Sequence, residues 1–149
     1  MAIGDICNRE VVFVNREATV QTACKLMRHY HVGSLVVVDE ADGKRKPIGI
    51  VTDRDVVVEV DAMELDPKVI TIGDIMSADL TTVSEKHGVF ETIEVMRFRG
   101  VRRLPVVGAE GQLVGIVAID DLLEVIAGEL TEIVHIISRE QSREQTARK

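Results

Sequence analysis

Aromatic residues are scarce in this sequence, which has no tryptophan, one tyrosine and three phenylalanines among 149 residues. Hydrophobic residues nevertheless make up 46% of the chain, so aliphatic side chains must fill its core. A chain of this length forms one compact domain, or two small halves that share a core. This composition favours Val- and Ile-rich strands packed under helices over a β-sandwich.

The chain also lacks a surplus of basic residues, a long apolar run and a cysteine motif. Its net charge of −7 argues against a nucleic-acid surface and against docking on anionic lipid. No apolar run is long enough to span a bilayer, and the first residues do not resemble a secretory signal. Cys7 and Cys24 form no C-x-x-C pair, which favours reduced, buried thiols. We therefore predict a cytoplasmic protein with neither nucleic acid nor membrane as a partner.

One sequence unit occurs twice along the chain. Residues 3–6, with the sequence IGDI, recur at residues 72–75, an offset of 69 that also relates Met27-Arg28 to Met96-Arg97. The offset falls to 66 after the polar stretch 42–47, which we interpret as a longer surface turn, and then Asp55 corresponds to Asp121. A register kept over this length indicates an internal duplication.

Each copy shows the same order of elements. An extended segment (residues 11–14 and 80–83) precedes a helix (19–30 and 88–99), two short strands (35–38 and 48–51; 104–107 and 113–117) and a second helix that starts near Asp53 or Asp120. One unit has too little core to fold alone, so two units should pack face to face about a pseudo-two-fold axis and leave two equivalent clefts. We predict an α+β fold with a first repeat at residues 1–69, a second at 70–127, and a C-terminal helix and charged tail at 128–149.

The end of the strand at residues 48–52 carries the clearest candidate site. Thr52 and Asp55 are spaced as an ordinary capping box, in which each side chain accepts a backbone N–H at the start of a helix. The same pair also suits a sugar, because an ionised carboxylate offers only acceptors and can hold a vicinal diol. The two interpretations are compatible.

The pattern apolar-Gly-apolar-apolar-Thr-x-x-Asp after a strand, present in tandem, resembles the cystathionine β-synthase (CBS) domain. Residues 100–107, GVRRLPVV, resemble the other half of that family's signature. Two such repeats form a Bateman module, and the resemblance covers about residues 3–127. It implies a β-α-β-β-α fold in each repeat. It also implies adenosine ligands (AMP, ADP, ATP or S-adenosylmethionine) in clefts between the repeats, and regulatory functions such as energy sensing.

The resemblance also implies a set of ligand-binding residues, divided unequally between the repeats. Thr52 and Asp55 match the ribose-contacting positions of the first repeat, whereas the second keeps Asp121 but has Ala118 in place of the hydroxyl residue. Conversely, the second repeat has Arg-Arg-Leu-Pro at residues 102–105, where the first has Gly-Ser-Leu-Val at 33–36. The expected ligand-binding residues are Thr52, Arg54, Asp55, Arg102, Arg103, Pro105 and Asp121.

Because each repeat lacks a different part of the family signature, we predict one composite site. In it, Arg102 or Arg103 contacts a phosphate of a ligand that is anchored by Thr52 and Asp55. The alternative for either arginine alone is an ion pair with a surface carboxylate. His29 and His31 could bind a metal only with a third ligand, which the neighbouring sequence lacks, so we predict no metal site and no required cofactor. No catalytic triad or phosphate-binding loop is evident either, so we do not expect an enzyme.

Residues 129–149 have no counterpart in the first repeat. Leu130, Ile133, Val134 and Ile137 form an apolar stripe at helical spacing. This stripe either packs on its own module or forms a contact between subunits, because Bateman modules commonly pair into dimers. We predict a regulatory adenosine-binding module, a homodimer that signals to an unidentified protein target; the alternative is a structural dimerisation module whose clefts bind nothing.

Overall fold

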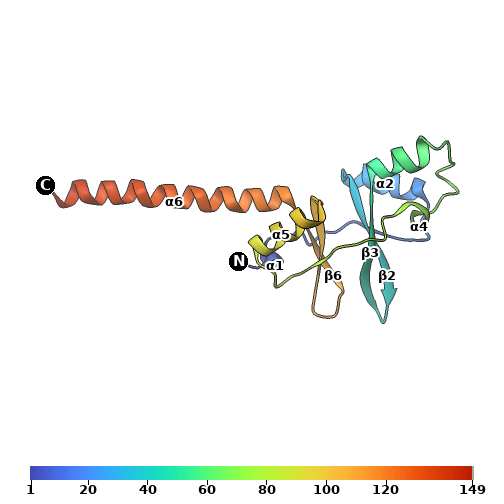
Figure 1. The fold of residues 1–149 in the computed structure, drawn as a ribbon, viewed down its shortest axis with the longest axis horizontal. Helices are drawn as coiled ribbons and strands as arrows, with labels where there is room; N and C mark the ends of the chain where they lie inside the picture. The colour runs from blue at the N-terminus through green and yellow to red at the C-terminus, as the bar shows by residue number, and fades with distance from the viewer. Residues whose placement is uncertain (149) are drawn as a thin grey trace.

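The computed structural model describes residues 1–148 and contains two three-stranded sheets, one in each repeat (Figure 1). In each sheet the first strand runs parallel to the second, which pairs antiparallel with the third. The predicted α+β class and the duplication are both confirmed. The strands are β1 (Phe13–Asn15), β2 (Ser34–Ala41) and β3 (Lys44–Thr52) in the first sheet, and β4 (Val83–Ser84), β5 (Arg103–Val107) and β6 (Leu113–Ala118) in the second.

In each repeat, a helix of 11 residues follows the first strand. These helices are α2 (Val20–Tyr30) and α5 (Val89–Arg99), within one residue of the predicted bounds. The Thr19 hydroxyl accepts the Thr22 N–H at 3.2 Å and caps α2. Both helices end at a residue with a left-handed backbone, His31 after α2 and Gly100 after α5. The apolar face of each helix covers its own sheet, as the buried Met27 and Met96 illustrate.

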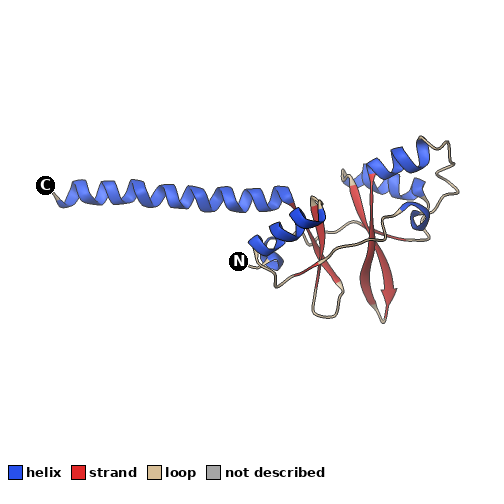
Figure 2. Ribbon diagram, in the orientation of Figure 1, coloured by secondary structure: helices blue, strands red, loops and turns tan. Residues whose placement is uncertain are grey.

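The helices that follow β3 and β6 differ in length. After β3 comes one turn of α-helix, α3 (Asp53–Val56), which continues as the π-helical segment η1 (Val57–Asp61). After β6 comes a single helix of 29 residues, α6 (Ile119–Ala147). The predicted second helix of the repeat and the predicted C-terminal helix therefore form one continuous element. Figure 2 shows that most of this helix projects away from the rest of the molecule.

The two IGDI segments form short helices, α1 (Ile3–Ile6) and α4 (Ile72–Ile75), and each packs on the opposite repeat. Ile3 is fully buried in the core of the second repeat, and Ile72 in the core of the first. The Ile3 N–H donates to the carbonyl of His87 at 2.7 Å, and the Ile72 N–H donates to that of Ala18 at 2.8 Å. Figure 1 shows this exchange, with α1 beside α5 and α4 beside α2. Neither core is complete without a residue from the other repeat.

Beyond each exchanged helix, the chain crosses the third strand of the opposite repeat. Ser77 pairs with Ile50 in β3, and Asn8 pairs with Ile116 in β6. A Cβ atom on Gly49 would lie 2.7 Å from the Ser77 carbonyl oxygen, so only glycine allows this close approach. The glycine of the apolar-Gly-apolar pattern is therefore required by contact between the repeats.

The apolar stripe of α6 lies on the exposed part of that helix. Leu130, Ile133, Val134 and Ile137 are each between 54% and 59% exposed. The sequence left two interpretations of this stripe open. Packing of the whole stripe on its own module is wrong, because α6 projects away from the rest of the molecule before the stripe ends. Within residues 1–148, none of the helices has the length and apolarity that a membrane crossing requires.

Candidate functional site

A cleft of about 560 Å³ lies between the two repeats. Its first wall comes from the end of β3 and the start of α3, where Ile50, Thr52 and Asp55 face the cavity. Its second wall comes from the second repeat and the segment that leads into β4. These residues are Ser77, Asp79, Leu80, Thr81, Phe98, Arg99, Val101, Arg102, Arg103 and Leu104.

Thr52 and Asp55 form the predicted capping box at the start of α3. The Asp55 N–H donates to the Thr52 hydroxyl oxygen at 3.1 Å, and the Thr52 N–H donates to Asp55 Oδ2 at 2.8 Å. No donor within residues 1–148 reaches Asp55 Oδ1, and the Thr52 hydroxyl has no acceptor there. The capping box thus fixes both side chains at the cleft and leaves one acceptor and one donor for a ligand.

Arginine side chains from the second repeat form the opposite wall. Arg102 and Arg103 are exposed, and neither makes an ion pair with any residue of the described chain. The alternative role that the sequence left open for these arginines, an ion pair with a surface carboxylate, is therefore not found in residues 1–148. The two guanidinium groups are therefore available to an anionic ligand, and their planar geometry suits phosphate oxygens.

A third arginine, Arg99, was not identified from the sequence. Its Nε donates to the Thr81 hydroxyl at 2.6 Å, and its guanidinium pairs with Asp79 at 3.0 Å. These contacts tie the end of α5 to the segment before β4 and hold that part of the cleft wall in place. The basic run Arg99-Gly100-Val101-Arg102-Arg103, which spans the predicted helix end, was the signal that could have identified it.

Two of the expected ligand-binding residues, Arg54 and Pro105, line neither this cleft nor the related cleft of the second repeat. Arg54 is exposed on α3 between Asp53 and Asp55, and consecutive helical residues point in directions about 100° apart. Pro105 is buried in the middle of β5, opposite Ile116 of β6. The structure brings together Thr52, Asp55, Arg102 and Arg103, but not Arg54 or Pro105.

The related cleft of the second repeat is smaller, at about 320 Å³. The Ala118 N–H donates to Asp121 Oδ2 at 2.7 Å, which repeats one half of the capping box. Ala118 has no hydroxyl to supply the other half. Gly33 and Ser34 occupy the positions of Arg102 and Arg103, and Glu10 adds an acidic group where the first cleft has Asp79. The second cleft is therefore poor in cations, and its one arginine, Arg103, also lines the first cleft.

Cys7 and Cys24 are free thiols, each partly buried. Burial raises the pKa of both thiols above the ordinary cysteine value, so the unreactive protonated form is favoured. The ring of His29 packs edge-on against Tyr30, with centroids 4.8 Å apart. Residues 1–148 contain no group of three or more His, Cys, Asp or Glu side chains arranged to hold a metal ion.

Comparison with known proteins gives consistent results. The family model of the CBS domain matches residues 3–62 and 72–128. An uncharacterized protein of Methanopyrus kandleri is 37% identical over 125 residues, which are 84% of this chain and 62% of that relative, so the chain spans less than two thirds of it. Hypoxic response protein 1 of Mycobacterium tuberculosis is 34% identical over 79% of this chain and 80% of its own.

A solved CBS domain pair in complex with 5′-methylthioadenosine and S-adenosyl-L-methionine superimposes with a TM-score of 0.72. It is 25% identical, and the match covers 87% of this chain and 98% of that one.

Proposed function

This chain belongs to the CBS-domain family as a tandem pair, and we propose that it is a regulatory module whose first cleft binds an adenosine ligand. The observation that carries the proposal is the composition of that cleft. Thr52 and Asp55 come from one repeat, and Arg102 and Arg103 come from the other. A ligand in which a ribose carries phosphates on one side matches both walls, and AMP, ADP and ATP are such ligands.

In this arrangement a ribose hydroxyl donates to Asp55 Oδ1, and the Thr52 hydroxyl donates to a ribose oxygen. The phosphates extend toward Arg102 and Arg103, while Ile50, Leu80 and Val101 provide apolar surface for the base. The solved CBS pair that holds 5′-methylthioadenosine and S-adenosyl-L-methionine supports this ligand class. S-adenosylmethionine carries no phosphate and offers the two arginines only a single carboxylate, next to its cationic ammonium and sulfonium groups, so the nucleotides fit better.

Regulation follows from contact with both repeats. A ligand that binds both walls can shift the equilibrium between two arrangements of the repeats. The free energy of that shift cannot exceed the difference in the ligand's binding free energy between the two arrangements. In our proposal the protein is a cytoplasmic homodimer that passes this signal to an unidentified protein target, and it has no catalytic activity. The alternative is a structural dimerisation module that binds nothing, which the loss of the hydroxyl at Ala118 and of the arginines at Gly33 and Ser34 favours.

Thermal unfolding with and without AMP, ADP, ATP and S-adenosylmethionine tests the proposal. A ligand present at about 100 times its Kd stabilises the protein by about 2.7 kcal/mol. For a domain of this size, that raises Tm by about 5–10 °C. No increase with any of the four ligands would refute ligand binding and leave the structural alternative.

Two matched variants test which cleft binds. Asp55→Ala and Asp121→Ala each remove one carboxylate that accepts a backbone N–H at a helix start, at 2.8 and 2.7 Å. Both variants should lower the ligand-free Tm by similar amounts, because each loses a similar cap. Only Asp55→Ala should lose most of the ligand-induced increase. Equal losses from both variants would show that the ranking of the clefts is wrong.

A further inference from the structure

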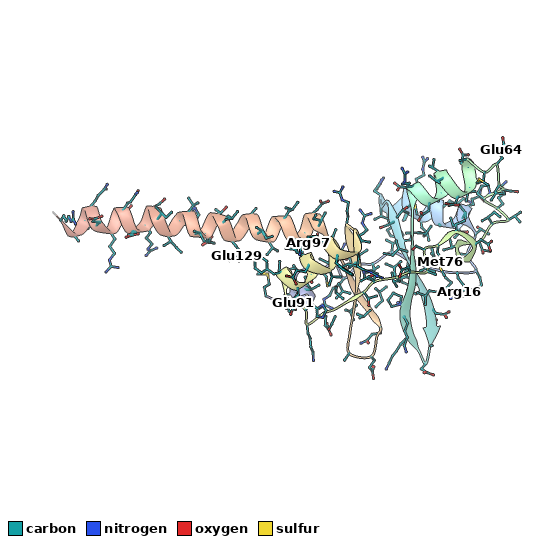
Figure 3. All side chains as sticks on the ribbon, in the orientation of Figure 1. Arg16, Glu64, Met76, Glu91, Arg97 and Glu129 are labelled. Carbon is teal, nitrogen blue, oxygen red and sulfur yellow. The ribbon has the colours of Figure 1, made fainter. Side chains whose placement is uncertain are left out.

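One wall of the first cleft carries an aromatic side chain that belongs to neither hydrophobic core. Phe98 lies in the last turn of α5, is 87% exposed, and is the one aromatic residue within residues 1–148 that lines this cleft. Figure 3 labels Glu91 near the start of α5 and Arg97 near its end, and that end lies toward the first repeat. The exposed ring is therefore available to a ligand in the cleft.

The wall that contains Phe98 is divided into a neutral part and a basic part. The neutral part consists of apolar side chains and an ion pair at 3.0 Å whose charges compensate each other: Leu80, Phe98, Val101 and the pair of Arg99 with Asp79. The basic part is Arg102 and Arg103, which have no ion-pair partner within the described chain. An anionic group is therefore attracted to one part of this wall, and an uncharged aromatic group fits the other.

We propose that Phe98 stacks on the base of the nucleotide in the first cleft and makes this cleft selective for ligands that carry a base. This inference rests on the proposed function. With the phosphates at Arg102 and Arg103, the base of the same nucleotide occupies the neutral part of the wall, where the Phe98 ring offers its face. Stacking of this kind contributes to binding for any base, because every base has a π-face. Phe98 thus distinguishes a nucleotide from a sugar phosphate and does not distinguish one base from another.

Two probes that differ only in the base test the role of Phe98. AMP and ribose 5-phosphate share the ribose and the phosphate, and ribose 5-phosphate has no base. Titration calorimetry measures the affinity of the full chain for each probe. We expect Phe98→Ala to bind AMP at least about 5-fold more weakly than the wild type and to bind ribose 5-phosphate with unchanged affinity. Phe98→Tyr keeps the aromatic ring and should bind AMP as the wild type does.

Phe90 provides a matched control on the same helix. It lies near the start of α5, is 76% exposed and does not line the first cleft. Phe90→Ala therefore removes the same side chain from an equally open position without changing the cleft, and it should alter the affinity for neither probe. Circular dichroism checks that every variant is folded, which we expect because neither ring belongs to a core.

Fluorescence gives a direct measure of stacking. The chain contains no tryptophan, so Phe98→Trp introduces a single indole at the cleft. A base that stacks on this indole should quench its fluorescence, so AMP should reduce the emission and ribose 5-phosphate should leave it unchanged. The emission of Phe90→Trp should respond to neither probe.

The outcomes separate this inference from the proposed function. If Phe98→Ala binds AMP as tightly as the wild type, or if bound AMP does not quench the indole of Phe98→Trp, the stacking role is overturned and nucleotide binding by the cleft stands. Equal losses of affinity for AMP and ribose 5-phosphate would also overturn it, because the ring would then maintain the shape of the cleft instead of contacting the base. A wild type that does not bind AMP would overturn both.

Discussion

Replacement of Gly49 by alanine tests the contact between the repeats. The added Cβ atom would lie 2.7 Å from the Ser77 carbonyl oxygen and 3.0 Å from Met76 Sδ, both closer than ordinary van der Waals contact. The methionine side chain can rotate away, but the carbonyl belongs to a backbone segment whose Ser77 N–H donates to the Ile50 carbonyl at 3.2 Å. The crossing segment must therefore shift by several tenths of an ångström.

Overpacking of this kind costs about 1–3 kcal/mol. For a chain of this length, each kcal/mol lowers Tm by about 2–4 °C, so Gly49→Ala should lower Tm by about 2–12 °C. Calorimetry or circular dichroism measures the change. Because Ser77 lines the first cleft, the same variant should also weaken any nucleotide-induced stabilisation.

The related Gly115→Ala is the matched control for this reasoning. Its Cβ atom would lie 2.5 Å from Cys7 Sγ, which is the movable end of a side chain, and 3.1 Å from the Asn8 carbonyl oxygen. We therefore expect a smaller loss of stability than from Gly49→Ala. A Gly49→Ala protein whose Tm lies within about 1 °C of the wild-type Tm would refute the argument, because the smallest expected loss is about 2 °C. A larger loss of stability from Gly115→Ala than from Gly49→Ala would also refute it.

Two further predictions follow from the helix starts. Ala118→Thr should restore the missing hydroxyl of the second cleft, and calorimetric titration with nucleotide should then detect a second, weaker site; an unchanged stoichiometry would contradict this. The backbone N–H of Thr71, which donates to Asp74 at 3.0 Å, lowers the pKa of that carboxyl. A lowered folded-state pKa means that Asp74 stabilises the fold above its unfolded pKa, and that this stabilisation is lost as the pH falls through the folded value. Asp74→Asn should therefore lower Tm at neutral pH and reduce its dependence on pH in the acid range, and identical pH profiles would show that the cap contributes nothing.

The sequence predicts the elements of this fold well and the contacts between its repeats poorly. The offsets of 69 and 66 correctly align α2 with α5 and β3 with β6, because both copies keep the same local apolar pattern. The same offsets cannot show that α1 completes the second core and α4 the first, because a duplicated pattern is identical whether or not the copies exchange a segment. The π-helical turn at η1 has no local signature in the sequence either.

In the candidate site too, the sequence predicts contacts within one element and misses contacts between elements. Thr52 and Asp55 were predicted from local spacing, because a capping box is a contact between residues three positions apart. Arg99 was missed, because its role depends on contacts with Asp79 and Thr81, which lie on a different element. Arg54 and Pro105 were included because they belong to the matching motifs. A motif does not specify which of its residues a helix or a strand turns toward the cleft.

Arg103 links the two clefts and limits what both can bind. It lines the first cleft together with Arg99 and Arg102, and it is the only arginine that lines the second within the described chain. One guanidinium group cannot contact anionic ligands in both clefts at once. The second cleft is also lined by the carboxylates of Glu10 and Asp121, which repel an anionic ligand. If a phosphorylated ligand in the first cleft engages Arg103, the second cleft loses its one arginine and becomes less favourable for a second anion. The duplication therefore produces two clefts of related shape, and an anionic ligand that engages Arg103 from the first cleft weakens anion binding in the second.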